Sequence, residues 1–202
     1  MSEPGFFDVV LRQRACRSFT DEEVPDDDLV RMLDAAVHAP SAENAQPWVF
    51  VVVRDPARRA AVADLTRRLW RDQARAAVEA RLEPRLFDEV DRATTTGFGD
   101  APVLVVVGGD TGAGTSRRAL PSSVLPAVQN LLLAAAALGY GSALTTLATM
   151  AGHELRSLLG LPDGVEPLAV VPIGRPARPL GPPRRLPVAA KAHREHYGQP
   201  FG

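Results

Sequence analysis

A helix with no polar side dominates the middle of this sequence. From Val124 to Leu138 nearly every residue is apolar, and Gly139 follows as a natural helix C-cap. A helix that is apolar all round belongs in a core or an interface, because none of its faces suits water. One domain of 202 residues does not easily cover so much apolar surface, so the stretch predicts a homodimer.

Short β-branched runs alternate with amphipathic segments along the rest of the chain. With no internal repeat and no interdomain linker, this order favours a single α/β or α+β domain over residues 1–202, with a Pro- and Arg-rich tail at 176–202. Strands buried on both faces are expected at Trp48–Val53 and Val103–Val107, a third strand at Leu168–Ile173, and a short one at Ser142–Leu147.

Helix signals fall between these strands. Three aspartates in the first turn and Pro40 at the end delimit the clearest helix, Asp26–Ala39, and Asp55-Pro56 is typical of a helix start. Gly108–Ser123 is rich in Gly, Thr, Ser and Pro and predicts a loop. The other expected helices are Phe6–Ala15, His153–Leu159 and the Arg-rich excursion from Arg58 to about Arg92, which breaks near Pro84.

Composition excludes several classes of protein. The 23 basic and 24 acidic residues nearly cancel, which argues against a nucleic-acid binder. The longest apolar run, Leu131–Gly141, is too short to span a bilayer, and the first residues carry no apolar signal core. The single cysteine, Cys16, cannot form an internal disulfide, which favours a reducing compartment. A cytoplasmic protein is therefore expected.

Two segments could bind an anion or a heterocycle. Arg12, Arg14 and Arg17 lie near the end of the first helix, where they form either a guanidinium seat for a phosphate or a solvated basic face. The polar loop from Pro40 to Trp48 offers the hydroxyl and amide groups of Ser41, Asn44 and Gln46. These groups could read the edge of a heterocycle or serve ordinary loop chemistry.

Other chemistry-bearing patterns are missing from the sequence. The Gly-rich segment after Val107 lacks the features of a phosphate-binding loop, and the four histidines form no metal set. Cys16 is either a thiolate favoured by nearby arginine or, more simply, a small buried residue. Candidate anion-binding sites in a sequence that shows no nucleophile motif are typical of an enzyme whose cofactor carries the chemistry.

Four stretches, taken together, resemble the FMN-dependent nitroreductase family over nearly the whole chain. The most specific is Ala-Pro-Ser-Ala-Glu-Asn-Ala-Gln-Pro-Trp at 39–48. The others are Gln-Arg-Ala-Cys-Arg-Ser-Phe at 13–19 with Val24-Pro25, the central helix with Gly-Tyr-Gly at 139–141, and Ile-Gly-Arg-Pro at 173–176 with Arg-Arg-Leu-Pro at 184–187.

The resemblance implies an α+β fold, a three-layer sandwich with a central mostly antiparallel sheet flanked by helices. It also implies an entwined homodimer with two FMN sites at its interface, in which the tail at 176–202 could wrap the partner subunit. FMN would pass hydride from NAD(P)H to a small-molecule electron acceptor in a ping-pong cycle.

The resemblance also implies which residues bind FMN. It implies no catalytic side chain, because FMN carries the chemistry, and no metal site. Around the phosphate, ribityl chain and pyrimidine edge we expect Arg14, Ala15 and Arg17, with Arg17 stabilising the anionic reduced flavin. Arg184 and Arg185 would close the phosphate clamp, Pro40, Ser41 and Asn44 would come from the partner subunit, and Thr145, Thr146 and Leu147 would lie under the flavin ring.

Departures from the family pattern leave the substrate open. Gln13 stands where the family often has arginine, Ala15 where it often has serine, and the 144–147 stretch lacks a glutamate found in some members. Trp70, Phe87 and Phe98 in the excursion could stack over the flavin, but core packing is the simpler interpretation. The leading function is reduction of nitroaromatics, quinones or related acceptors. The alternatives are a dehydrogenase, a dehalogenase, a flavin-processing enzyme and a flavin-binding protein without turnover.

Overall fold

The computed structural model describes residues 4–114 and 116–201. At its centre is a four-stranded sheet in the order β1-β2-β4-β3, in which every neighbouring pair is antiparallel. The strands are β1 (Trp48–Val53), β2 (Val103–Asp110), β3 (Gly141–Ser142) and β4 (Val165–Gly174). The expected antiparallel sheet is therefore confirmed.

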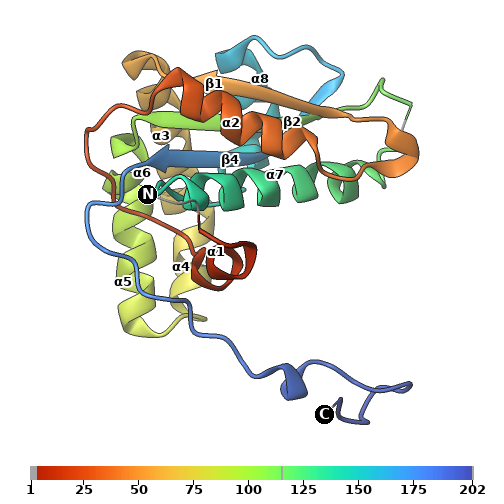
Figure 1. Ribbon diagram of the computed structural model, residues 1–202. Helices are drawn as coiled ribbons and strands as arrows, with labels where there is room; N and C mark the ends of the chain where they lie inside the picture. Colours follow the sequence, from red (N-terminus) through yellow and green to blue (C-terminus); the bar gives the residue numbers. More distant parts are fainter. Residues whose placement is uncertain (1–3, 115, 202) are drawn as a thin grey trace.

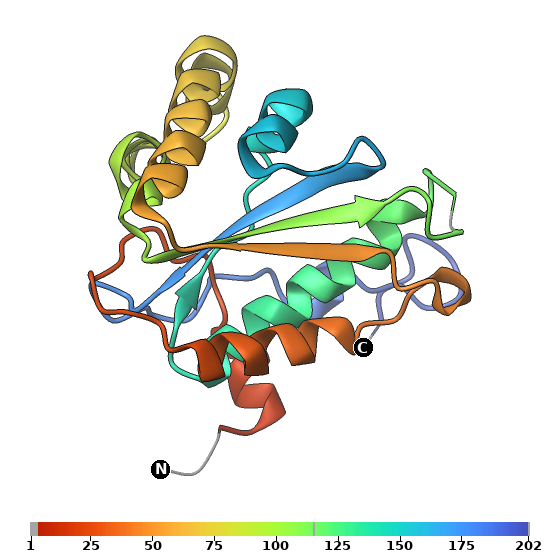
Figure 2. The ribbon, with the colours of Figure 1, turned by 90° about the horizontal axis from the view of Figure 1, so that it is seen from above.

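Helices cover both faces of this sheet. On one face, α2 (Asp26–Val37) and α7 (Leu120–Ala137) pack on Val103, Val105 and Val107. On the other face, helices of the excursion and α8 (Gly152–Leu159) pack on the alternate side chains of β2. Figure 1 and Figure 2 show the three layers, which confirms the predicted sandwich.

The two strands expected to be buried on both faces differ in position. Successive side chains of β2 point to opposite faces, and those of residues 103–107 are at most 1% exposed. Strand β1 has the predicted bounds, but it is an edge strand, and only Val53 on it is fully buried. Side chains of β1 contact both cores, Phe50 and Val52 on one face and Val51 and Val53 on the other, but all except Val53 are only partly buried because the strand lies at the edge of the sheet.

The predicted loop at 108–123 is shorter than expected at both ends. Strand β2 continues to Asp110 because its two glycines leave room for neighbouring segments of the same chain. A Cβ on Gly109, for example, would lie 2.7 Å from the Leu120 side chain. Helix α7 begins at Leu120, four residues earlier than expected, and ends before Gly139, whose φ of 81° suits a C-cap.

Helix α7 is unusually apolar along its whole length. Among the described residues it is the one helix long and apolar enough to cross a membrane, with a mean hydropathy of 1.4 over 18 residues. It lies under the sheet beside α2, which is the position of a core helix (Figure 2).

The short strand expected at 142–147 is limited to β3, after which the chain continues into the 3₁₀ turn η4 (Ala148–Ala151).

The Arg-rich excursion folds into two helical arms. The first arm consists of α3 (Pro56–Leu69), a π-helical turn η2 (Trp70–Ala74) and α4 (Arg75–Glu79). The second arm consists of α5 (Pro84–Arg92), a π-helical turn η3 (Ala93–Gly97) and α6 (Phe98–Asp100). Asp55 caps α3 by accepting the Arg58 N–H at 2.9 Å, as the sequence predicted. In Figure 1, α4 and α5 project together from the sheet layers.

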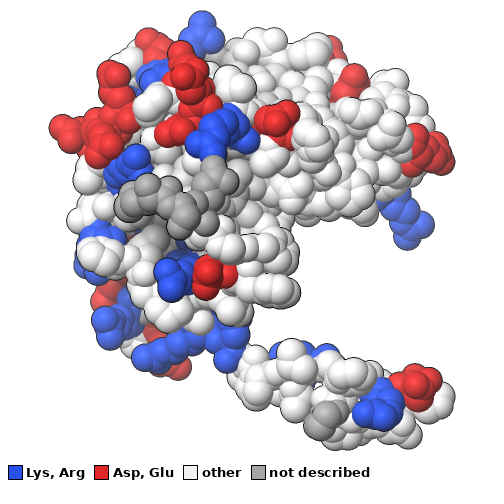
Figure 3. All heavy atoms as spheres, in the orientation of Figure 1, with Lys and Arg blue, Asp and Glu red and all other residues white. Residues whose placement is uncertain are grey.

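Both ends of the described chain expose apolar side chains. Helix α1 (Phe6–Arg12) has no buried residue, and Phe6 and Phe7 are 69% and 76% exposed. The tail leaves the rest of the domain, forms the short turn η5 (Val188–Ala190) and stands apart in Figure 3. In the same view, the surface over α7 carries almost no charge. A lone subunit therefore leaves apolar side chains uncovered at both ends of the described chain.

One glycine allows the N-terminal segment to pack against the sheet. A Cβ on Gly141 would lie 2.5 Å from the Cys16 sulfur, whereas a Cβ on Gly152 would meet nothing within 4 Å. We expect Gly141→Ala to lower the free energy of unfolding by about 1–3 kcal/mol through overpacking. The control Gly152→Ala, at the start of α8, should be neutral or stabilising by about 0.4–1 kcal/mol. Chemical denaturation of both variants measures the difference, and equal stabilities would contradict this packing.

Candidate functional site

A cavity of about 320 Å³ opens between the two arms and the loop that follows β3. The segment 15–17, both arms and residues 143–147 contribute to its walls. Arg17 is the one charged residue among the described residues that line it, and most of the others are apolar. The cavity is therefore suited to a flat, largely apolar molecule with one anionic or electron-rich edge.

Arg17 reaches the cavity because the segment before it joins the sheet. Ala15 forms a parallel bridge with Ser142, and the Cys16 N–H donates to the Ser142 carbonyl at 2.9 Å. The guanidinium of Arg17 then donates to Glu89 on α5 at 3.1 Å. The arginine is thus fixed at its backbone by β3 and at its tip by the second arm.

The loop after β3 presents backbone donors to the same cavity. Thr145 exchanges two backbone hydrogen bonds with Val170, and its hydroxyl donates to the same carbonyl at 3.0 Å. Within the part of the chain that the structure describes, the N–H groups of Thr146 and Leu147 have no acceptor. They precede the turn η4, and the first N–H groups of a helical turn are free to bind a ligand atom. The structure therefore brings Ala15, Arg17 and residues 145–147 together.

Arg14 does not line the cavity of Arg17 and belongs to another hollow, of about 210 Å³. Its guanidinium donates to the carbonyl of Gly181 at 3.3 Å, which holds the start of the tail against this side of the molecule. Arg184 and Arg185 follow on the tail with exposed side chains, and Arg185 donates to the Arg184 carbonyl at 3.0 Å. Their convergence with Arg14 on a phosphate stays a prediction.

The loop from Pro40 to Trp48 lies at the opposite end of the sheet. Trp48 pairs with Gly109, whereas Val53, at the other end of β1, pairs with Leu104 near the end that carries β3. At about 3.3 Å per residue, the length of β1 separates these ends by roughly 17 Å. Pro40, Ser41 and Asn44 therefore do not meet Arg17 within one chain.

This loop is strained and held in place. Glu43, Asn44 and Gln46 have φ values of 55°, 54° and 49°, a region that residues other than glycine rarely adopt. The Ser41 hydroxyl accepts the Gln46 N–H at 3.0 Å, and the Ser123 hydroxyl of α7 accepts the Ala42 N–H at 3.1 Å. Backbone strain of this kind persists where the surrounding structure fixes it, and it concentrates at binding sites.

Cys16 borders the cavity as a buried thiol. It is 1% exposed, and burial raises the pKa of its thiol above the ordinary 9.0, even though a backbone hydrogen bond at Ser18 and the charge of Arg17 act in the opposite direction. Its burial and the direction of this pKa shift both support the buried-residue interpretation over the thiolate.

The burial of Cys16 predicts low reactivity toward thiol reagents. At pH 8 a chromogenic disulfide reagent should label the native protein slowly, because the thiol is both inaccessible and protonated. The protein unfolded in denaturant should release one equivalent at once. Rapid labelling of the native protein would show that the segment 15–17 leaves its place against β3.

Sequence reasoning missed the polar contacts between the arms. Trp70, Phe87 and Phe98 are 3–7% exposed; Phe87 is packed in the core, whereas Trp70 and Phe98 also line the cavity, so stacking on a flavin stays a prediction for these two. Glu89 and Asp91, however, connect the arms to Arg17 and Trp70 and carried no recognised signal. The run Thr94-Thr95-Thr96 is a local mark of the π turn there, since each hydroxyl donates to the carbonyl four residues earlier.

Comparison with known proteins gives a consistent result. The model of the nitroreductase family matches residues 10–175. A putative NADH dehydrogenase/NAD(P)H nitroreductase of Methanothermobacter thermautotrophicus is 28% identical over 183 residues, which are 90% of this chain and 82% of the relative. An iodotyrosine deiodinase of Thermotoga neapolitana is 30% identical over 86% of this chain and 89% of its own length. The crystal structure of a putative nitroreductase from Desulfovibrio desulfuricans in complex with FMN superposes with a TM-score of 0.77 at 27% identity, covering 100% of both chains.

Proposed function

Since this chain belongs to the nitroreductase family, we propose that it is an FMN-dependent oxidoreductase. In this proposal it transfers hydride from NAD(P)H through FMN to a small, uncharged organic acceptor such as a nitroaromatic or a quinone. The observation that carries the proposal is the cavity in which Arg17 and the N–H groups of Thr146 and Leu147 meet among apolar walls. The FMN complex of the similar Desulfovibrio protein supports the choice of cofactor.

The residues present fit a flavin. A cationic side chain beside the pyrimidine edge stabilises the reduced anion, and Arg17, which lines the cavity, is proposed for this role. N–H groups with no acceptor inside the described chain, such as those of Thr146 and Leu147, suit the hydrogen-bonding edge of the ring. Bound FMN supplies the hydride acceptor and donor that no side chain of the protein provides.

In this proposal, the residues of the chain bind FMN, orient it in the cavity and shield it from water. Glu89 holds the Arg17 guanidinium at 3.1 Å and so aims its charge at one side of the cavity. Thr145, fixed to Val170, places the two following N–H groups. The buried faces of the arms, Trp70 and Phe98 among them, keep water from the inner wall. Arg14, Arg184 and Arg185 are proposed to bind the phosphate.

Two copies of the chain are proposed to form the complete site. The strained loop with Ser41 and Asn44 lies at the far end of the sheet from Arg17, so a second subunit must bring it there. Leu186 and Val188 on the tail are 65% and 70% exposed, an arrangement that the surface of a partner subunit would cover. The single domain over residues 1–202 and the tail wrapped on the partner belong to the same proposal.

A same-fold alternative is dehalogenation, suggested by the iodotyrosine deiodinase of Thermotoga neapolitana. An amino acid substrate carries an ammonium and a carboxylate group. Among the described residues that line the cavity, only Arg17 is charged, so no carboxylate of this chain lines it to pair with the ammonium. Burying an unpaired charge is costly, so the cavity favours an uncharged acceptor.

Spectroscopy of the purified protein tests the proposal directly. We expect a yellow protein whose flavin absorbance bleaches under nitrogen on addition of NADH or NADPH and returns on addition of a nitroaromatic or quinone. A flavin that neither nucleotide reduces would favour the deiodinase-like or the non-catalytic alternative. Absence of bound FMN, with none taken up on reconstitution, would overturn the proposal.

A further inference from the structure

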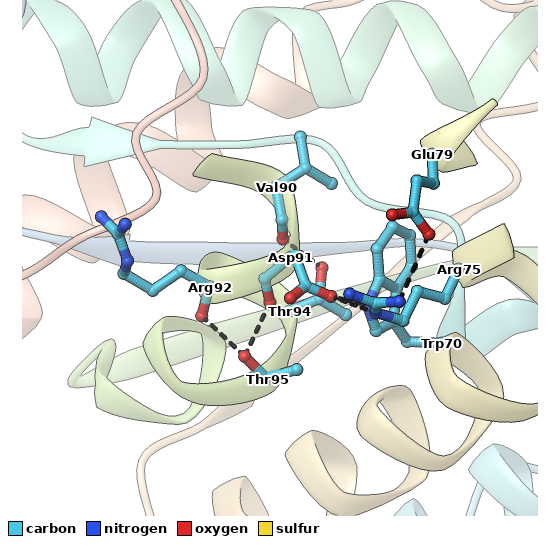
Figure 4. A network of polar contacts seen from close by, with 8 residues as sticks. All are labelled: Trp70, Arg75, Glu79, Val90, Asp91, Arg92, Thr94 and Thr95. Carbon is cyan, nitrogen blue, oxygen red and sulfur yellow. Dashed lines mark hydrogen bonds and ion pairs between the residues drawn. The ribbon is translucent and has the colours of Figure 1, made fainter. Parts of the chain in front are cut away.

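One carboxylate oxygen joins the two arms. Oδ1 of Asp91, on the second arm, accepts the indole N–H of Trp70 at 2.8 Å and the Nε–H of Arg75 at 2.9 Å, both on the first arm. Arg75 also reaches Glu79 at 3.3 Å (Figure 4). Asp91 is therefore the point at which the start of one π-helical turn, the start of the following helix and the opposite arm meet.

The surroundings of Asp91 keep this linkage intact. The Trp70 ring is 3% exposed and stacks on Phe87 with ring centroids 6.4 Å apart, while the Arg75 guanidinium lies 5.1 Å from the Phe87 centroid. The hydrogen bond from Trp70, followed by the one from Arg75, lowers the pKa of Asp91 below 3.8. The carboxylate is thus ionised wherever the protein is folded at ordinary pH.

The arms are irregular where they border the cavity. In a π-helical turn each N–H reaches back five residues instead of four, and such turns are frequent at functional sites. On the second arm, Thr94, Thr95 and Thr96 donate their hydroxyls to the carbonyls of Val90, Asp91 and Arg92 at 2.7–2.8 Å. The threonines therefore satisfy carbonyls four residues back, and the turn keeps its shape without a ligand.

The same two irregular turns line the cavity. Trp70 and Ala74 form one wall, and Val90, Ala93 and Thr94 form the facing wall, on the helix face beside Asp91. The distance between these walls depends on whatever joins the arms. Arg67 supplies a second link, from its Nε to the Thr95 carbonyl at 2.8 Å, and Arg59 a third, to the Gly99 carbonyl at 3.4 Å, but neither bonds to the Trp70 indole.

We propose that Asp91 is the positioning residue that fixes the width of this cavity and thereby restricts the acceptor to compact, flat, uncharged molecules. The inference rests on the proposed function, because it concerns the molecule that accepts hydride there. A wall held within a fraction of an ångström lets a flat ring stack closely, and a misplacement of about 1 Å is enough to cost roughly a hundredfold in rate. A bulky acceptor gains nothing from a narrow slot and loses little when the slot widens.

The chain offers a matched control for a test of Asp91. Asp72 lies in the first π turn and pairs with Arg71 Nε at 2.8 Å, but both side chains are exposed and the pair joins no second arm. For the FMN-loaded protein we measure kcat and KM with a compact acceptor, 1,4-benzoquinone, and a bulky one, a naphthoquinone with a long alkyl chain. We expect Asp91→Ala to lower the ratio of kcat/KM values, compact over bulky, by roughly tenfold, and Asp72→Ala to leave it unchanged.

Further measurements separate positioning from general stability. Asp91→Asn keeps an oxygen for the Trp70 N–H, so it should fold and should recover part of the acceptor ratio. In a Trp48→Phe background, which leaves Trp70 as the single tryptophan, the fluorescence maximum should shift to longer wavelength in Asp91→Ala and not in Asp72→Ala. Equal loss of rate with both acceptors, or an unshifted Trp70 emission, would overturn the inference while leaving the proposed function intact.

Failure of the proposed function has a different signature. If the unmodified protein bound no FMN or transferred no hydride, no acceptor ratio could be measured for any variant. In that case, quenching of Trp70 fluorescence by nitrobenzene measures how tightly a compact aromatic molecule binds in the cavity, and it tests the role of Asp91 without hydride transfer. Asp91→Ala should weaken nitrobenzene binding several-fold relative to Asp72→Ala, and equal binding would overturn it.

Discussion

Replacement of both Arg14 and Arg185 by alanine is expected to yield a colourless, folded protein. In the proposed clamp these arginines bind the FMN phosphate from the two ends of the chain. Charge-assisted contacts to phosphate are among the stronger ones that proteins make, so loss of two should raise the Kd for FMN by about a hundredfold or more. Neither side chain is buried, and the fold should survive their removal.

A second double variant serves as the control for charge. Arg81 and Arg118 are exposed and line none of the cavities described above, so Arg81→Ala with Arg118→Ala removes the same charge and should stay yellow. The flavin-to-protein absorbance ratio after gel filtration measures the difference. Stoichiometric FMN in the Arg14/Arg185 variant would show that the phosphate is bound elsewhere.

Mixing two inactive variants should restore flavin binding. Ser41 and Asn44 lie at one end of the sheet and Arg17 at the other, so each proposed site combines one end of one subunit with the opposite end of its partner. A dimer of Arg14→Ala/Arg185→Ala subunits lacks the phosphate clamp in both sites, and a dimer of Ser41→Ala/Asn44→Ala subunits lacks the loop contacts in both. A mixed dimer has both defects in one site and none in the other.

Co-expression with two different affinity tags isolates the mixed dimer. Its expected flavin content is one FMN per dimer, half that of the unmodified protein, against near zero for the clamp-deficient parent. The matched control pairs the clamp-deficient subunit with an Arg81→Ala subunit, which leaves one clamp per dimer and should also bind one FMN. Flavin that is bound by a monomer, or a mixed dimer as empty as its parent, would contradict a site shared between subunits.

Local sequence was sufficient for most of the elements. The bounds of β1 match, α2 ends two residues early, and α8 begins one residue early, because aspartates in first turns, Pro40 and the glycines after helices are signals that act within a few residues. The same locality explains the misses. Whether 108–110 extends a strand depends on the absence of a side chain beside Leu120 and Val165, neither of which is its neighbour in the sequence.

The candidate site also combines features that are visible in the local sequence with contacts that only the structure shows. The motif at 39–48 was recognisable as a string of residues, and the structure adds that three of its residues have positive φ. The contacts of Glu89 with Arg17 and of Asp91 with Trp70 join residues 72 and 21 positions apart, and acidic residues on a helix of mixed charge give no indication of either.

By itself the sequence determined the family, the sandwich and the residues available to bind a flavin, since apolar periodicity, helix caps and the 39–48 motif are all written in short stretches. Only the tertiary structure decided where those residues lie: Arg17 in a cavity with the 145–147 loop, Arg14 on another side, and the Ser41 loop at the far end of the sheet. The physical reason is that strand order and the packing of the arms arise from contacts between distant segments, and these fix positions that no local pattern encodes.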